Sequence, residues 1–124
     1  ITAAGELRLL EYSQRLATRA RNVTAEDGST GARLFTAARR GGAQALGAPE
    51  PAIAVGEVAD LVGLVDPMAL GLADDRLLDR WVFGPDLAVA EVWAAGRHLV
   101  ADGRHIHREE IAKNAARAIR RVLT

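Results

Sequence analysis

The sequence predicts an α+β fold whose sheet is incomplete. Apolar residues recur at helical spacing in three long stretches of the 124-residue chain, two before residue 47 and one at the end. A short apolar run and three β-type runs joined by two short turns predict four strands. The last three strands form a meander that cannot close a barrel, so their apolar face needs further strands or a cover. Because the chain begins with Ile1 rather than Met, we expect those strands in a preceding part of a longer polypeptide.

A first helix is expected over residues 4–23, with Thr2 as its N-cap. Apolar residues at near-helical spacing predict its core-facing side, and charged residues fill much of the opposite side. The apolar positions are Leu9, Leu16, Ala20 and Val23, and the charged ones are Arg8, Glu11, Arg15 and Arg19.

A second helix is expected over residues 30–46, with Ser29 or Thr30 as its N-cap and Gly47 at its end. Its apolar stripe comprises Leu34, Phe35, Ala38, Gly42, Ala45 and Leu46. The small members of this stripe allow a neighbouring backbone to approach closely, which predicts tight packing on a large neighbour.

The pattern changes after residues 48–51, which contain two prolines. Residues 61–65 form a short apolar run closed by Asp66-Pro67, which predicts a buried strand. Residues 75–83 predict a short amphipathic helix. Its inward side chains are Leu77, Leu78, Trp81 and Val82.

The clearest local signals predict strands over residues 89–94, 98–101 and 104–106. Ala95-Gly96 and Asp102-Gly103 are the two turns between them, and Asp-Gly is favoured in two-residue hairpins because both positions tolerate positive φ.

The final helix is expected over residues 108–123. Its stripe comprises Ile111, Ala112, Ala115, Ile119, Val122 and Leu123. Acidic residues lie near its start and arginines near its end, which suits the helix dipole.

Composition excludes several classes of function. Hydrophobic residues make up 49% and charged residues 26%, which is not typical of a disordered tail. The net charge of zero argues against a broad nucleic-acid surface. Residues 1–10 contain two charges and no long apolar run, so they predict neither a signal peptide nor a membrane span. The lack of cysteine excludes disulfides and thiolate metal sites and favours a cytoplasmic location.

Two groups of polar residues are candidate sites. His105 and His107 alternate on a strand and could share a metal with His98, but only if the strand register allowed it. Asp74, Asp75 and Asp79 resemble a carboxylate cluster, but arginines are interleaved with them. We interpret the histidines as structural hairpin residues and the aspartates as a solvated helix start. Trp81 and Trp93 are interpreted as core or interface anchors. The predicted set of catalytic, cofactor-binding and metal-binding residues in this segment is therefore empty.

Three ordered stretches resemble the closing portion of the amidohydrolase superfamily. Residues 36–47 end in A-Q-A-L-G, residues 55–62 read V-G-E-V-A-D-L-V, and residues 92–105 match the hairpin of that superfamily. Within it, residues 6–16 followed by Arg19 are similar to the helix after the last barrel strand of formimidoylglutamate deiminases.

The resemblance implies a C-terminal portion of a (β/α)8 barrel enzyme with a small β-sandwich domain. Residues 1–48 would be helices closing the barrel, 49–106 part of the sandwich, and 107–124 a C-terminal helix. It implies zinc or another divalent metal bound by residues outside this segment, and hydrolysis of N-formimino-L-glutamate to N-formyl-L-glutamate and ammonia in histidine degradation. The implied partners are the rest of the enzyme chain and a small-molecule substrate, and a homodimer is left open.

Two alternatives remain at this point. One is another aminohydrolase of the superfamily, of the guanine or chlorotriazine type, which shares the sandwich motifs. The other is a stand-alone interaction domain that binds a partner through surfaces around Trp81 and Trp93.

Overall fold

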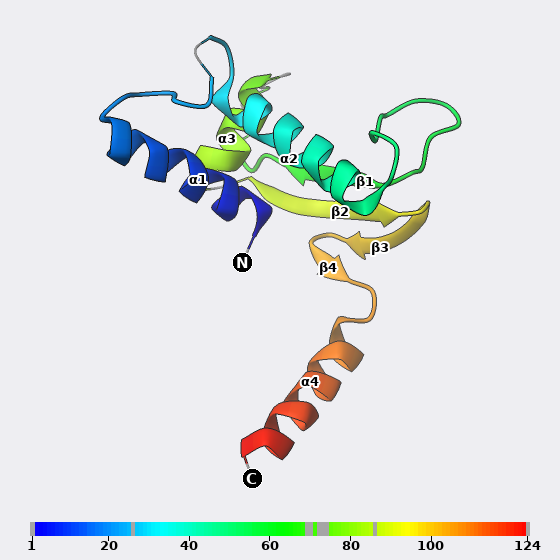
Figure 1. The fold of residues 1–124 in the computed structure, drawn as a ribbon. Coiled ribbons are helices and arrows are strands. Elements are labelled where there is room, and N and C mark those ends of the chain that lie inside the picture. The colour runs from blue at the N-terminus through cyan, green and yellow to red at the C-terminus, as the bar shows by residue number, and fades with distance from the viewer. Residues whose placement is uncertain (1, 26, 69–70, 72–74, 86, 124) are drawn as a thin grey trace. The chain divides into compact units, whose positions relative to one another are not determined.

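The computed structural model describes every residue except 1, 26, 69–70, 72–74, 86 and 124. Along the chain lie α1 (Ala3–Thr18), α2 (Thr30–Leu46), β1 (Leu61–Val65), α3 (Asp75–Phe83), β2 (Ala88–Ala94), β3 (Arg97–Ala101), β4 (Arg104–His105) and α4 (Arg108–Leu123). This order confirms the predicted α+β class and the predicted succession of elements (Figure 1).

The chain divides into two compact units. The first, here called the helical unit, consists of Ile1–Glu57 with Asp66–Ala88 and contains α1, α2 and α3. The second, the sheet unit, consists of Val58–Val65 with Val89–Thr124 and contains the strands and α4.

Helices α2 and α3 form the best-packed part of the helical unit. Leu34 of α2 is only 2% exposed and Val82 of α3 is fully buried. A Cβ atom on Gly31 would lie 2.5 Å from the Leu78 carbonyl oxygen, so only glycine lets the start of α2 approach α3 this closely. Nearby, the Phe35 ring meets Trp81 edge-on, with ring centroids 5.9 Å apart. The predicted inward side of α3 is confirmed here.

Both predicted ends of α2 are confirmed. The Ser29 hydroxyl oxygen accepts a hydrogen bond from the Ala32 N–H at 2.9 Å, which satisfies one of the free donors of the first turn. Gly47 ends the helix in the left-handed region, at φ 63°.

Helix α1 differs from the prediction in its length and in its buried face. It ends at Thr18 rather than residue 23, because Arg19 adopts the left-handed conformation at φ 55°. Leu9 and Leu16 of the predicted core stripe are 64% and 81% exposed, whereas Glu11 is fully buried. The face that packs on α3 is the charged one. Arg8 donates from Nε to the Val82 carbonyl and from Nη2 to the Gly84 carbonyl, which caps the end of α3.

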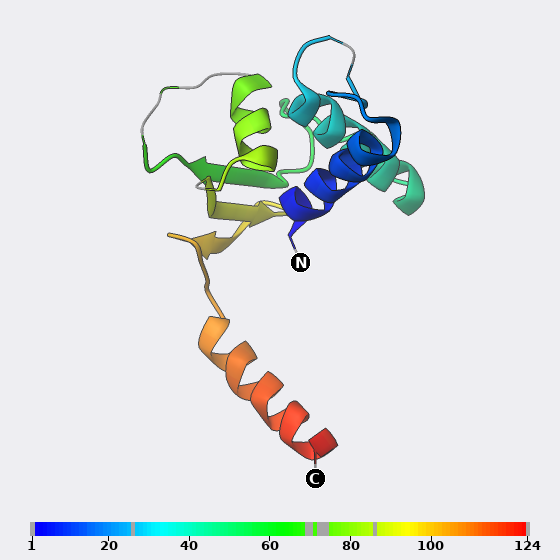
Figure 2. The ribbon, with the colours of Figure 1, turned by 90° about the vertical axis from the view of Figure 1, so that its left-hand side faces the viewer.

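The four strands of the sheet unit follow one another in the order β1-β2-β3-β4 (Figure 2). Strands β2 and β3 are antiparallel, with Val92 opposite Val100 and Ala94 opposite Arg97, and a bulge separates Val92 from Trp93. Strand β4 pairs antiparallel with β3. The predicted meander is confirmed.

Both hairpin turns place two successive residues at positive φ. Ala95 and Gly96 lie at 48° and 74°, and Asp102 and Gly103 at 50° and 73°. This pattern is typical of the turns that suit the right-handed twist of hairpins, and it explains why the glycines follow directly.

The sheet unit has little interior of its own. Every residue of the four strands is exposed or half-buried, so the prediction that residues 61–65 form a buried strand is wrong for the described residues. The buried hydrophobic residues among those described are Ala25, Leu34, Ala43 and Val82, all in the helical unit. Among the described helices, none combines the length and the apolar character required to cross a membrane.

Candidate functional site

His98 lies in a small surface cluster of the sheet unit. Its ring stacks on Trp93 with centroids 4.6 Å apart and planes at 10°, and its Nε2 contacts Glu91 Oε2. Glu91 Oε1 accepts the Asp102 backbone N–H at 3.1 Å. This N–H, together with His98, lowers the pKa of Glu91 below its usual value. The cluster therefore ties β2 to β3 and to the turn that follows β3.

His105 and His107 interact with each other instead. The His105 Nδ1 atom accepts the His107 backbone N–H at 3.0 Å, and the rings lie 5.8 Å apart with planes at 48°. Within the described residues no three His, Asp or Glu side chains gather in a way that could hold a metal ion. The three histidines therefore do not form a shared metal site, and the Nε2 atom of His98 contacts Glu91 instead.

Of the three candidate aspartates, the structure describes the side chain of Asp79 alone. Asp74 lies outside the described residues, as does the side chain of Asp75. Asp79 is half-buried, and its Oδ1 accepts the Gly31 N–H at 2.7 Å. The interpretation of this residue as part of a solvated helix start is thus wrong, because Asp79 satisfies a free donor at the start of α2. The neighbouring Arg80 pairs with Asp66 at 2.6 Å in a largely buried position.

The most strongly organised polar centre among the described residues surrounds Glu11, although the helical pattern predicts this residue on the outer side of its helix. Oε1 accepts from Arg15 Nε at 2.7 Å and from the Val23 N–H at 2.9 Å. Oε2 accepts from the Thr24 N–H at 3.1 Å and from the Thr24 hydroxyl. Four donors therefore converge on one buried carboxylate.

The electrostatics of Glu11 favour its charged form. Burial alone raises the pKa of this carboxyl, but the hydrogen bonds from Thr24, Arg15 and Val23 outweigh burial and leave the pKa below its usual value. The sequence offers one signal for this centre, the spacing of four between Glu11 and Arg15. The other donors come from the loop after α1, which no periodicity predicts.

A shallow pocket of about 300 Å³ adjoins this centre in the helical unit. It is lined by Tyr12, Arg15, Asn22, Gly28, Thr30, Asp79 and Phe83. The guanidinium of Arg15 lies 5.6 Å from the Tyr12 ring centroid and 5.2 Å from that of Phe83, and its Nη2 donates to Asn22. Since Arg15 and Asp79 already have structural partners, the arrangement fixes the loop between α1 and α2 and offers no nucleophile with a base beside it.

Comparison with known proteins gives two strong similarities. The chain is 46% identical over 118 residues to a formimidoylglutamate deiminase of Pseudomonas aeruginosa. The alignment covers 91% of this chain and 26% of that protein. It also matches the crystal structure of an amidohydrolase from Brucella melitensis, with a TM-score of 0.90 and 42% identity over 96% of this chain and 27% of the other. The chain thus spans about a quarter of the length of these relatives. No family model matches it.

Proposed function

We propose that this chain, which is homologous to part of formimidoylglutamate deiminase, forms the C-terminal structural part of a metal-dependent deiminase. Its structural neighbour is likewise an amidohydrolase. The observation that carries the proposal is the 46% identity over 91% of the chain, together with a structural match at a TM-score of 0.90. This similarity also favours the enzyme over a stand-alone interaction domain, because it extends through both units and not only around the tryptophans.

The complete enzyme would hydrolyse N-formimino-L-glutamate to N-formyl-L-glutamate and ammonia, as a cytoplasmic step of histidine degradation. A bound zinc or other divalent metal would lower the pKa of the attacking water. The described residues do not fit such a metal, since no three ligand side chains converge. The metal ligands and catalytic groups are therefore assigned to other parts of the polypeptide, and no catalytic step is assigned to a residue of this segment.

The role of the segment itself would be to close the barrel and to complete the sandwich. Residues 1–48 would pack on the barrel and residues 49–106 would join strands from elsewhere in the chain. Exposed apolar side chains support this assignment. Leu9 and Leu16 of α1 are mostly exposed, and Leu46 at the end of α2 is 84% exposed. Burying one leucine stabilises a protein by about 1.5–3 kcal/mol, so these faces suit a covering surface.

The activity is tested with the natural-length polypeptide loaded with zinc. We expect release of ammonia and N-formyl-L-glutamate from N-formimino-L-glutamate, measured by a coupled ammonia assay and by mass spectrometry. Guanine and a chlorotriazine serve as competing substrates. A turnover restricted to one of these would replace the proposed substrate with that of another aminohydrolase, and the absence of any hydrolysis would contradict the enzyme assignment.

The structural role is tested by Leu16→Asp in the same polypeptide, with Gln14→Asp as the matched control on the same helix. If the barrel covers Leu16, the Asp variant loses at least about 2 kcal/mol of stability, whereas the control stays within about 0.5 kcal/mol. Equal stability of the two variants would contradict coverage of this face. As a further check, the 124 residues can be expressed alone. A stand-alone domain would unfold in one cooperative transition, whereas we expect this segment to lack such a transition.

A further inference from the structure

The chain contains two Asp-Gly pairs, Asp27-Gly28 and Asp102-Gly103. In such a pair the backbone nitrogen of the glycine can attack the aspartate side chain, because glycine has no Cβ atom to shield it. The attack forms a five-membered succinimide ring, and hydrolysis of the ring gives aspartate or isoaspartate. The reaction requires a backbone N–H without a partner and a main chain that can bend toward the carboxyl group. The surroundings of each pair therefore decide whether it reacts.

Asp102-Gly103 is fixed in the turn between β3 and β4. The Gly103 N–H donates to the Ala90 carbonyl at 2.8 Å, and the Asp102 N–H donates to Glu91 Oε1 at 3.1 Å. The attacking nitrogen is thus engaged, and its release breaks a hydrogen bond that ties the turn to β2.

Asp27-Gly28 lies in the loop between α1 and α2, and its groups are not engaged in this way. Both residues are exposed, and no described residue hydrogen-bonds to the Asp27 carboxyl group or to the Gly28 N–H. A Cβ atom on Gly28 would meet nothing within 4 Å, so the backbone here has room to move. Exposed loops with small and polar residues are the places where a chain opens most readily.

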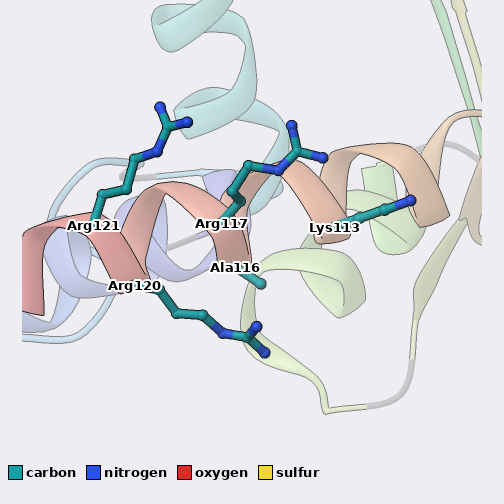
Figure 3. A pocket seen from close by; sticks show the side chains of 5 residues that line it. All are labelled: Lys113, Ala116, Arg117, Arg120 and Arg121. Carbon is teal, nitrogen blue, oxygen red and sulfur yellow. The ribbon is translucent and has the colours of Figure 1, made fainter. Parts of the chain in front are cut away.

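The two asparagines, which can form the same ring, are protected as well. Asn22 is followed by Val23, whose N–H donates to Glu11 Oε1 at 2.9 Å. Asn114 lies in α4, where the helical ribbon is unbroken along the labelled residues (Figure 3). Inside an α-helix the next N–H is bonded to a carbonyl of the preceding turn. Of these four positions, Asp27 is therefore followed by the most accessible nitrogen.

We propose that Asp27-Gly28 is a site of spontaneous isomerisation that converts Asp27 to isoaspartate. The Gly28 nitrogen bonds to the side-chain carbon Cγ of Asp27, and the hydroxyl of the carboxyl group leaves with the N–H proton as water. One water then adds to the main-chain carbonyl carbon of Asp27 and opens the ring there. The main chain now runs through Cγ, the mass is unchanged, and a new α-carboxylate is exposed. This carboxylate is the group that an isoaspartyl methyltransferase methylates with S-adenosylmethionine.

The position of the site in the loop gives the reaction a structural consequence. On one side Thr24 is fixed by hydrogen bonds to the Glu11 carboxylate, and on the other side Ser29 caps α2. Isoaspartate adds one carbon atom to the main chain between these two fixed points. The lengthened loop weakens the contacts at its ends, so the accumulation of isoaspartate lowers the stability of the helical unit.

The site is tested by incubating the natural-length polypeptide near neutral pH and measuring isoaspartate over time. Trypsin cleaves after arginine and lysine, so it releases Asp27 in the peptide 22–33 and Asp102 in the peptide 98–104. Isoaspartate is quantified in each peptide by mass spectrometry and by methylation with an isoaspartyl methyltransferase. We expect it to accumulate at least about tenfold faster in 22–33, which corresponds to a barrier lower by about 1.4 kcal/mol. A smaller ratio, or the absence of isoaspartate from 22–33, would overturn the proposal.

Two controls separate the fold from the local sequence. Asp27→Glu keeps the charge but cannot close a five-membered ring, so it should remove the isoaspartate of peptide 22–33 and leave that of 98–104 unchanged. In the polypeptide unfolded in guanidinium chloride, the Gly103 N–H is released, and the two peptides should react at rates within about threefold of each other. A larger difference in the unfolded chain would show that neighbouring residues, and not the fold, select the site.

The structural consequence is tested by urea denaturation of the parent and of Asp27→Glu, before and after the same incubation. We expect the urea midpoint of the parent to fall as isoaspartate accumulates, and that of Asp27→Glu to stay constant. An unchanged midpoint in a parent sample rich in isoaspartate would overturn the weakening of the helical unit, and so would an equal fall in both proteins. None of these measurements depends on enzymatic activity, so they stand apart from the test of the proposed function.

Discussion

The helical unit and the sheet unit bury their side chains to very different extents. In the helical unit, Leu34, Val82 and Glu11 are at most 2% exposed, and three helices meet around them. In the sheet unit, neither a strand residue nor a described residue of α4 is buried. Both units nevertheless have regular backbone hydrogen bonding. The comparison teaches that local sequence signals suffice to define strands and turns, whereas an interior requires surfaces that meet.

The largest expected effect tests the interior of the helical unit. Leu34→Ala removes a side chain that is 2% exposed and leaves a cavity beside α3. We expect a loss of about 2–5 kcal/mol in the free energy of unfolding, measured by urea denaturation of the natural-length polypeptide. Leu34→Met keeps the volume and should cost less than about 1.5 kcal/mol. If the alanine variant were as stable as the parent, the helical unit would have no more interior than the sheet unit.

The next effect concerns the polar centre of the same unit. Glu11→Gln replaces one acceptor oxygen by an amide that faces the N–H groups of Val23 and Thr24 or the guanidinium of Arg15. A buried donor left without an acceptor costs about 1–3 kcal/mol, and we expect a loss in this range by urea denaturation. Glu6→Gln changes an exposed carboxylate on the same helix and should stay within about 0.5 kcal/mol. Similar losses in both variants would remove the distinction between the buried and the exposed glutamate.

The pH dependence of stability sharpens the role of Glu11. Its folded-state pKa lies below the ordinary value of 4.5, so its contribution is fully present above that value. As the pH falls below about 4.5 and passes through the folded-state pKa, the folded carboxylate takes up its proton and the contribution is lost. The stability difference between the parent and Glu11→Gln should therefore shrink between neutral pH and pH 3, measured by urea denaturation at each pH. A difference that grows on acidification would show that the pKa is raised instead.

Sequence patterns predicted the backbone of this chain better than its buried surfaces. The ends of α2 and the two hairpin turns follow from single residues, Ser29, Gly47, Gly96 and Gly103, whose backbone and side-chain preferences are local. The packed face of α1 depends instead on where α3 and the following loop lie, so the apolar stripe containing Leu16 pointed to the wrong side for the described residues. Periodicity indicates which side can be buried, but not which partner buries it.

The candidate sites show the same limit. Alternation in the sequence placed His105 and His107 close together, but it could not predict that a backbone N–H would occupy the Nδ1 atom of His105. The centre around Glu11 escaped prediction because two of its donors are backbone N–H groups of a loop, which carry no residue-type signature. The absence of catalytic residues from this segment stays a prediction, which is tested in the natural-length polypeptide.

The smallest expected effect concerns two turns of the sheet unit that have almost the same backbone conformation. Ala95 and Asp102 occupy the first position of their turns at φ 48° and 50°, and each is followed by glycine. A left-handed conformation costs an L-residue roughly 1–2 kcal/mol, and short polar side chains such as Asn and Asp tolerate it better than alanine does. We therefore expect Ala95→Asn to stabilise the protein by about 0.5 kcal/mol and Asp102→Ala to destabilise it by a similar amount, both measured as shifts of the urea midpoint. Because neither change alters a buried surface, opposite shifts would confirm that this unit is governed by local backbone preference. A loss of stability in Ala95→Asn would instead show that the turn is packed against other parts of the polypeptide. The difference in burial between the two units would then hold for this segment alone and would disappear in the longer polypeptide.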